Sequence, residues 1–154
     1  MPVTLERDDL DVIEARIDDW LAVQLAENPT VEAVERDTET GERRWFVRVL
    51  GEEKSVYSVW LHLQQRSLHF ETYVMPAPEE NAEQLYAHLL RRNLKLHEMA
   101  FAIGAEDAVF LLGQLPVERI SDDELDRILG SVYAYVELCF RPAMRIGYAS
   151  KFKG

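Results

Sequence analysis

Residues 54–75 read KSVYSVWLHLQQRSLHFETYVM, and this stretch decides the fold because its two halves can pair with each other. Polar and apolar residues alternate on both sides of Gln65 and Arg66, a pattern that is typical of two antiparallel strands joined by a tight turn. A turn at these two residues fixes the register of the hairpin. One face then pairs Leu63 with Leu68, Leu61 with Phe70, Val59 with Thr72, and Tyr57 with Val74.

The opposite face of this predicted hairpin mixes aromatic and polar side chains. Polar groups cost free energy when they are buried without hydrogen-bond partners. We therefore expect this face to be partly exposed. Its cross-strand pairs are His62 with His69, Trp60 with Glu71, Ser58 with Tyr73, and Val56 with Met75.

Two alternating stretches precede the hairpin and extend it into an antiparallel meander. Residues 43–50 predict a strand rich in aromatic and β-branched residues, and residues 38–41 and 51–53 supply turns. Residues 31–36 are also strand-like, but the sequence leaves their assignment open.

The chain after the meander predicts a helix and then a pair of strands. Pro78, followed by two glutamates, favours the first turn of a helix that runs to about Leu96. Strands are predicted over residues 98–103 and 108–115, with residues 104–107 as a tight connection. The stretch 108–115 is apolar almost throughout, which predicts a strand buried on both faces.

Amphipathic helices are predicted at both ends of the chain. Apolar residues recur every three or four positions over residues 8–27. Ser121 and Glu124 form a capping box that begins the last helix, which is predicted to end before Pro142.

The resulting order α-β-β-β-α-β-β-α predicts an α+β fold with an antiparallel sheet, and residues 31–36 would add one N-terminal strand. We expect a single domain over residues 1–140 and a basic tail over residues 141–154. The tail has four cations and no acid, whereas the preceding residues have 13 cations and 28 acids. The tail is either a frayed terminus or a segment that docks on the acidic body or on a partner, with Arg145, Tyr148, Lys151 and Phe152 as candidate contacts.

Charge and hydropathy exclude several classes of partner. A net charge of −11 argues against a nucleic-acid-binding protein, because phosphate contacts require clustered cations. No apolar run is long enough to span a bilayer, so no membrane partner is expected. Residues 1–9 contain acids where an export signal needs basic and apolar residues, and we expect a cytoplasmic protein.

Motifs for catalysis are absent from the sequence. The chain contains no phosphate-binding glycine loop, no nucleophile elbow and no H-E-x-x-H pair. Its single cysteine, Cys139, lies on the predicted inner stripe of the last helix, where a thiol packs as a small hydrophobe. We therefore expect neither an enzyme nor a cofactor.

Two alternatives to a simple binding protein remain open. His62, His69 and Glu71 share one face of the predicted hairpin, and such side chains are compatible with zinc in a small metal-dependent enzyme or metal sensor. Solvated polar residues on an open sheet face explain the same three positions. A regulator that senses a small molecule between helices and sheet is the other alternative.

The predicted order of elements resembles the fold of type III secretion chaperones, and more specifically the chain resembles the YbjN-domain proteins, a bacterial family with that fold. The residues that carry the resemblance are Arg44–Gly51, Glu71–Glu79, Phe101–Gly104 and Gly113–Pro116. The resemblance implies a cytoplasmic, dimeric protein without enzymatic activity. The family is described as chaperone-like or as sensory transduction regulators, and the implied partner is an unidentified protein or peptide.

The resemblance also implies which residues make contacts. Secretion chaperones dimerise through the helix after the meander, which marks Leu85, Tyr86, Leu89 and Leu90 as candidates for a homodimer interface. Their clients lie along exposed sheet and helix surfaces, which marks Trp60, His62, His69 and Tyr73 as candidates for client binding. The basic tail has no clear counterpart in those chaperones, so a role in secretion is not implied by the resemblance.

Overall fold

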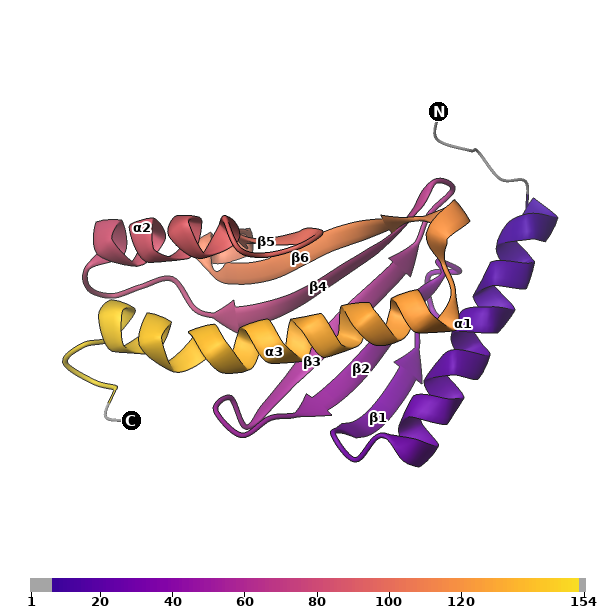
Figure 1. The fold of residues 1–154 in the computed structure, drawn as a ribbon, viewed down its shortest axis with the longest axis horizontal. Helices are drawn as coiled ribbons and strands as arrows, with labels where there is room; N and C mark the ends of the chain where they lie inside the picture. The colour runs from indigo at the N-terminus through magenta and orange to yellow at the C-terminus, as the bar shows by residue number, and fades with distance from the viewer. Residues whose placement is uncertain (1–6, 153–154) are drawn as a thin grey trace.

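The computed structural model describes residues 7–152, in which six antiparallel strands form one sheet of order β1-β2-β3-β4-β6-β5 (Figure 1). The α-helices of this region are α1 (Arg7–Glu27), α2 (Ala82–Asn93) and α3 (Asp122–Gly147). The strands are β1 (Val31–Arg36), β2 (Arg44–Leu50), β3 (Val56–Leu63), β4 (Ser67–Met75), β5 (Met99–Ile103) and β6 (Val109–Pro116).

The predicted α+β class and antiparallel sheet are confirmed. Residues 31–36, whose assignment the sequence left open, form strand β1. Residues 1–6 and 153–154 lie outside the described residues. Two predictions fall partly on these residues. They are the absence of an export signal from residues 1–9 and the basic tail over residues 141–154.

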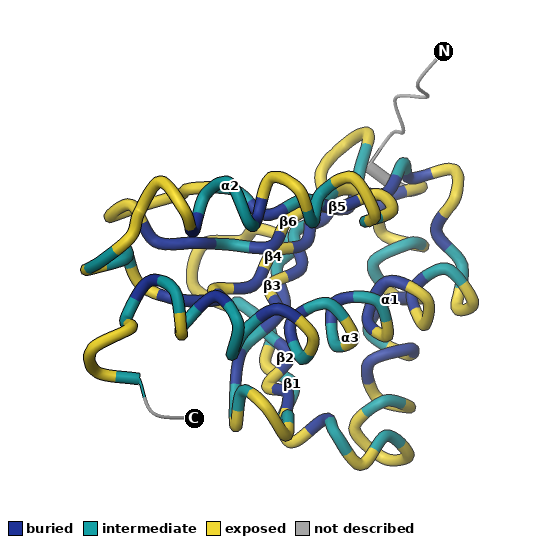
Figure 2. The backbone as a smooth tube through the Cα atoms, turned by 60° about the vertical axis from the view of Figure 1, so that its left-hand side comes forward, coloured by how far each residue is buried: buried dark blue, intermediate teal, exposed yellow. Residues whose placement is uncertain are grey.

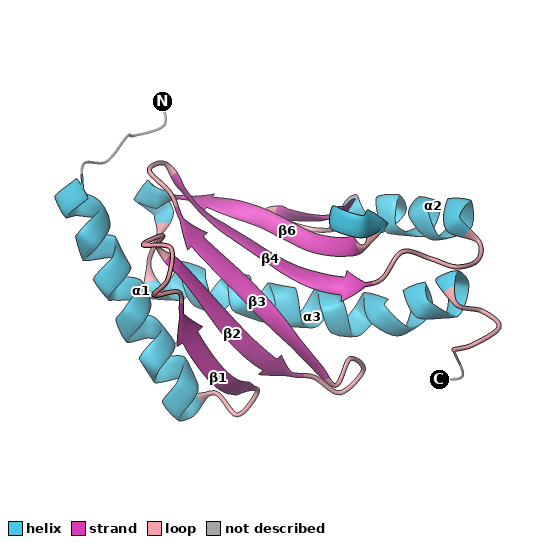
Figure 3. Ribbon diagram, turned by 180° about the vertical axis from the view of Figure 1, so that it is seen from behind, coloured by secondary structure: helices cyan, strands magenta, loops and turns pink. Residues whose placement is uncertain are grey.

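One face of the sheet is covered by helices and the other is open. Helix α3 crosses the covered face, and α1 packs beside β1 (Figure 1). Seen from behind, no helix lies in front of the strands from β1 to β4 (Figure 3). Figure 2 shows buried segments running along the strands and recurring at intervals along the helices. The period of two in each strand therefore separates the core from the open face.

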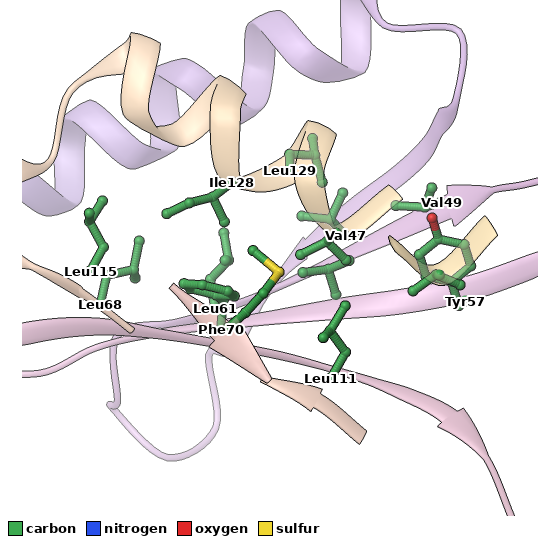
Figure 4. Packing of buried hydrophobic residues seen from close by; sticks show 14 of the residues in the cluster. Val47, Val49, Tyr57, Leu61, Leu68, Phe70, Leu111, Leu115, Ile128 and Leu129 are labelled. Carbon is green, nitrogen blue, oxygen red and sulfur yellow. The ribbon is translucent and has the colours of Figure 1, made fainter. Parts of the chain in front are cut away.

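The register predicted for the β3–β4 hairpin is confirmed at five pairs, which run from Val59 opposite Thr72 to Leu63 opposite Leu68. The apolar side chains of these strands point toward α3 (Figure 4). Leu68 and Leu115 lie below Ile128 in that view, and all three side chains are buried. Each fully buried aliphatic side chain of this kind contributes about 1.5–3 kcal/mol to stability.

Strand β6 differs from the prediction that it is buried on both faces. Leu111 and Leu115 are buried, but Leu112 is 37% exposed and Gln114 is exposed. The prediction was wrong because an apolar run does not reveal that a neighbouring sheet face lacks a covering helix. Leu112 is an apolar residue on the open face.

Helix α2 begins later than predicted. Asn81 precedes it in the left-handed region, with φ of 53°, so the helix starts at Ala82 rather than at Pro78. The backbone N–H groups of Glu79 and Glu80 donate to the Gly147 carbonyl at 3.0 Å each. These bonds to the end of α3 hold the segment out of the helix. The helix also ends at Asn93, before the predicted Leu96.

Helix α3 continues through Pro142 and ends at Gly147, so the predicted end before Pro142 was wrong. Proline inside a helix removes one backbone hydrogen bond and costs about 3 kcal/mol. Ala143 and Gly147 beyond it are buried, and this packing offsets the cost. The predicted division of the chain at residues 140 and 141 therefore falls inside a continuous helix.

Both edges of the sheet carry features that hinder further strand pairing. At β5, the Asn93 side chain bonds both the N–H and the C=O of Phe101, at 2.8 and 3.1 Å. At β1, the register shifts between Val31 and Ala33, which marks a bulge. Bulges and covered backbone groups protect edge strands from pairing with other chains.

Candidate functional site

The open face of the sheet gathers aromatic side chains from neighbouring strands. Phe46 and Trp60 are directly opposite on β2 and β3 and form an edge-to-face pair, with ring centroids 4.8 Å apart at 86°. Tyr73 and Phe110 are opposite on β4 and β6, with centroids 5.7 Å apart at 84°. Trp60 remains 48% exposed and Tyr73 44% exposed. The face thus presents rings that its own packing leaves half uncovered.

A shallow depression of about 300 Å³ lies on this face. Residues of β2, β3, β4 and β6 contribute to it, so it runs across the strands. The cross-strand row from Phe46 through Trp60 and Glu71 to Leu112 passes through it. Its lining comprises Arg44, Phe46, Trp60, Leu61, His62, Gln64, His69, Phe70, Glu71, Leu112 and Gly113.

The two histidines predicted on this face are opposite each other, as expected. His62 Nε2 lies 2.9 Å from Glu42 Oε2, and its Nδ1 lies 3.3 Å from Gln64 Nε2. Among residues 7–152, no group of three His, Cys, Asp or Glu side chains is arranged to hold a metal ion. His62, His69 and Glu71 therefore do not form such a group in this structure.

The charge state of His69 is set by its surroundings on this face. Loss of solvation at the strand surface lowers the pKa of His69, and His62 across the strand pair lowers it further. Glu71 acts in the opposite direction. The lowered pKa favours the neutral imidazole of His69.

One end of the open face is fixed to α3 through the β2–β3 turn. Glu137 of α3 accepts the backbone N–H groups of Glu52 and Glu53 at 2.6 Å each. Lys54 Nζ donates to the carbonyls of Tyr73 and Val74, both at 2.8 Å, and lies over the Tyr73 ring. These bonds position Tyr73 on an otherwise uncovered surface.

The structure separates the four residues of the predicted dimer interface. Leu85 and Leu89 are buried within the chain, so their side chains belong to its own core. Tyr86 is half-buried against that core. Leu90 is 66% exposed, and Leu94 just beyond the helix is 86% exposed. Only this outer side of α2 presents apolar surface to a partner.

The predicted tail residues lie against the segment between β4 and α2. The Tyr148 hydroxyl donates to the Ala77 carbonyl at 2.6 Å, and Lys151 Nζ lies 2.6 Å from Glu79 Oε2. Ser150 donates to Glu80, and these bonds lower the pKa of the Glu80 carboxyl. Phe152 packs edge-to-face on Phe140, and Arg145 is exposed on the last turns of α3.

Sequence reasoning missed three apolar members of the open face, namely Phe46, Phe110 and Leu112. The alternation in residues 44–50 contained a signal for Phe46, since it lies between Trp45 and Val47, both of which are buried. For Phe110 and Leu112 no such signal existed, because the whole of residues 108–112 is apolar.

The sequence model of the YbjN family, described as "Putative bacterial sensory transduction regulator", matches residues 15–143. An uncharacterized protein of Mycobacterium tuberculosis is 32% identical over 108 residues, which are 70% of this chain and 59% of that protein. An uncharacterized protein of Mycobacterium leprae is 30% identical over 110 residues, which are 71% of this chain and 60% of that protein. The chain thus spans about three-fifths of the length of these relatives.

Solved structures with the same fold include type III secretion chaperone complexes. A chain of the ExsC–ExsE complex aligns with a TM-score of 0.58 at 17% identity, covering 83% of this chain and 93% of that one. A chain of the HopA1–SchA chaperone–effector complex aligns with a TM-score of 0.56 at 12% identity, covering 86% of this chain and 94% of that one. The Yersinia pestis type III secretion chaperone SycH, in complex with a fragment of YscM2, aligns with a TM-score of 0.52 at 21% identity. The alignment covers 80% of this chain and 96% of that one. The predicted chaperone-like fold is confirmed.

Proposed function

The chain belongs to the YbjN family, and from this premise we propose that it is a non-catalytic, chaperone-like or regulatory protein that binds another protein through its open sheet face. The shared fold supports a binding role, since two of the similar structures hold a chaperone together with a protein partner. The proposal includes a cytoplasmic location and no cofactor. It includes no role in secretion.

The observation that carries the proposal is the concentration of rings on a sheet face that no described helix covers. Trp60, Tyr73 and Leu112 are all more than one-third exposed there. Contiguous exposed apolar surface on a folded chain is typical of interaction sites. Trp and Tyr are also the residues that most often dominate binding free energy at protein interfaces.

The partner is expected to lie across the strands rather than to extend the sheet. Asn93 occupies the backbone groups of Phe101 at the β5 edge, and a bulge interrupts β1 at the other edge. Affinity would then come from side chains seated on the face. The depression, at about 300 Å³, has room for an anchor side chain that would contact Trp60, Leu112 and the Glu71 that lies between them in the row.

Affinity capture from a lysate of the source bacterium tests this proposal, followed by calorimetry with the protein that is captured. We expect Trp60→Ala and Leu112→Ala each to weaken binding of that protein about tenfold or more. Leu138→Ala is the matched control, because Leu138 is a 56% exposed apolar residue on α3 rather than on the sheet. Unchanged affinity in both open-face variants would contradict the proposal.

A homodimer is the second part of the proposal. Leu90 and Leu94 support it as an exposed apolar surface on and just after α2. Sedimentation analysis is expected to give a dimer for the wild type and a monomer for Leu90→Glu. The control Val12→Glu introduces the same charge at an equally exposed apolar residue of α1. A wild type that sediments as a monomer would contradict the proposed homodimer, but it would not contradict the proposed protein binding at the open face.

The depression also favours a second candidate function, a regulator that senses a small molecule. Its volume is at the lower end of small-ligand sites, and Arg44, His62 and Glu71 offer polar contacts. Thermal-shift screening with metabolite mixtures distinguishes the candidates. A metabolite that stabilises the wild type but not Trp60→Ala would favour the sensor.

A further inference from the structure

We propose that a cleft between α1 and α3, on the helix-covered side of the sheet, receives a lysine or arginine side chain from a partner protein. The cleft has a volume of about 290 Å³. It lies on the opposite side of the sheet from the open face, so the two sites can be occupied independently. Its lining comprises Gln24, Asn28, Thr30, Val49, Asp126, Leu129, Gly130 and Tyr133.

Gly130 is the residue of this cleft that the chain's own packing does not explain. It lies within the 26-residue helix α3, where glycine is less favourable than alanine. A Cβ atom added at Gly130 would meet nothing within 4 Å. The missing side chain therefore relieves no clash inside the chain, but it does leave room for an occupant that approaches the helix backbone closely.

The polar wall of the cleft is a carboxylate that is held in place. Trp20 Nε1 donates to Asp126 Oδ1 at 2.8 Å, and Gln24 Nε2 donates to the same oxygen at 3.2 Å. Trp20 is buried, which fixes the direction of the first bond. Asp126 is exposed, so its carboxylate is also open to a donor from outside the chain. A carboxylate oriented in this way suits a cationic donor.

The rest of the cleft suits the apolar stem of a long cationic side chain. Val49 and Leu129 are buried and line the bottom of the cleft with aliphatic side chains, and the partly buried Tyr133 supplies an aromatic wall. Lysine and arginine bury their methylene groups on such surfaces while the charged end reaches a polar partner. The net charge of −11 also favours a partner segment that is basic.

Titration of 15N-labelled protein with blocked tripeptides tests the proposal. The probes are acetyl-Ala-Lys-Ala-amide, its arginine counterpart, and counterparts with norleucine or glutamate at the centre. We expect the two cationic peptides to shift the Trp20 indole N–H and the Gly130 amide resonances saturably. Norleucine has nearly the shape of lysine without the charge, so equal binding of the norleucine peptide would overturn the proposal. So would the absence of any shift.

Three variants locate the binding and separate it from folding. Gly130→Ala is expected to raise the thermal midpoint, because alanine favours the helix, and yet to weaken lysine-peptide binding about fivefold or more. Asp126→Asn is expected to weaken it similarly. Asp123→Asn makes the same charge change on α3 outside the cleft and should bind like the wild type. Wild-type affinity in Gly130→Ala would overturn the proposal, since that variant is expected to fold at least as well.

Discussion

The side-chain amide of Asn93 closes both free backbone positions of Phe101: its Oδ1 accepts the amide hydrogen at 2.8 Å and its Nδ2 donates to the carbonyl at 3.1 Å. Asn93 thereby takes the place that a neighbouring strand would fill at the outer edge of β5. A helix residue protects a sheet edge, and the edge in turn holds the end of α2.

Asn93→Ala is expected to lower the free energy of unfolding by about 1–3 kcal/mol, because two partly buried hydrogen bonds are lost. It also uncovers the β5 edge, so we expect concentration-dependent self-association. Urea unfolding and sedimentation measure the two effects. Asn93→Asp retains an oxygen that can accept the Phe101 amide hydrogen, so it should self-associate less than Asn93→Ala. An alanine variant with wild-type stability and mass would contradict the role of the amide.

Gly51→Ala is expected to destabilise the fold by about 1–3 kcal/mol, because the added methyl group overpacks a closed turn. A Cβ at Gly51 would lie 2.2 Å from Glu137 Oε1 and 2.4 Å from the Lys54 carbonyl. Thermal and urea unfolding measure the loss. The control is Gly41→Ala, where a Cβ meets nothing within 4 Å but φ is 76°, so only the cost of backbone strain applies. Equal losses in both variants would argue against the contact with Glu137.

Lys54 is expected to make stability rise with pH between about 8 and 10.5, which are its folded and ordinary pKa values. Burial lowers the pKa of Lys54 from 10.5 to about 8, so above pH 8 the unfolded chain binds more protons at this residue than the folded chain. The carbonyls of Tyr73 and Val74 and solvent near the ammonium group oppose the shift, so we expect a gain of only about 1 kcal/mol.

Urea unfolding at several pH values measures this rise in wild type and in Lys54→Met. The difference between the two isolates Lys54, because Cys139 and the tyrosines titrate in both. Parallel pH profiles would show that Lys54 titrates normally.

Two tryptophans on adjacent strands are expected to differ sharply in their effect on stability. Trp45 is 1% exposed and donates to Asp18 at 2.7 Å, so Trp45→Ala should cost about 3–5 kcal/mol. Trp60 is 48% exposed, and Trp60→Ala should cost about 0.5–1.5 kcal/mol, mainly the ring pair with Phe46. Urea unfolding compares them directly. Comparable losses would contradict the assignment of Trp60 to an exposed binding face.

The hairpin register was predictable because it depends on local information. Gln65 and Arg66 fix the turn, and the period of two then determines which side chains share a face. The same alternation predicted that Trp60, His69 and Tyr73 would lie on a partly exposed face, and the structure confirms this. Met75, which it placed on the same face, is buried instead, because the register shifts between Tyr73 and Met75. Cys139 was also placed correctly in the core, since its helix stripe is strongly apolar.

The remaining features depend on contacts between distant segments, which local patterns do not contain. Leu89 and Leu90 are adjacent and identical in type, yet one is buried and the other exposed. Pro142 lies within a helix because the residues beyond it pack into the core. Nothing in the sequence around Asn93 predicted that its side-chain amide would bond the backbone of Phe101. The cleft at Gly130 likewise requires two helices to be placed side by side.

The hydrogen bonds between the end of α3 and the segment before α2 have a consequence for hydrogen exchange. The Gly147 carbonyl accepts the N–H groups of Glu79 and Glu80, and Asn81 Nδ2 donates to the Ile146 carbonyl. Amide protons of an irregular, proline-containing segment normally exchange rapidly with deuterium. Here we expect those of Glu79 and Glu80 to exchange only when the last turn of α3 opens. The loop and the helix end therefore form one cooperative unit of local unfolding, and slow deuterium uptake should extend beyond the regular elements.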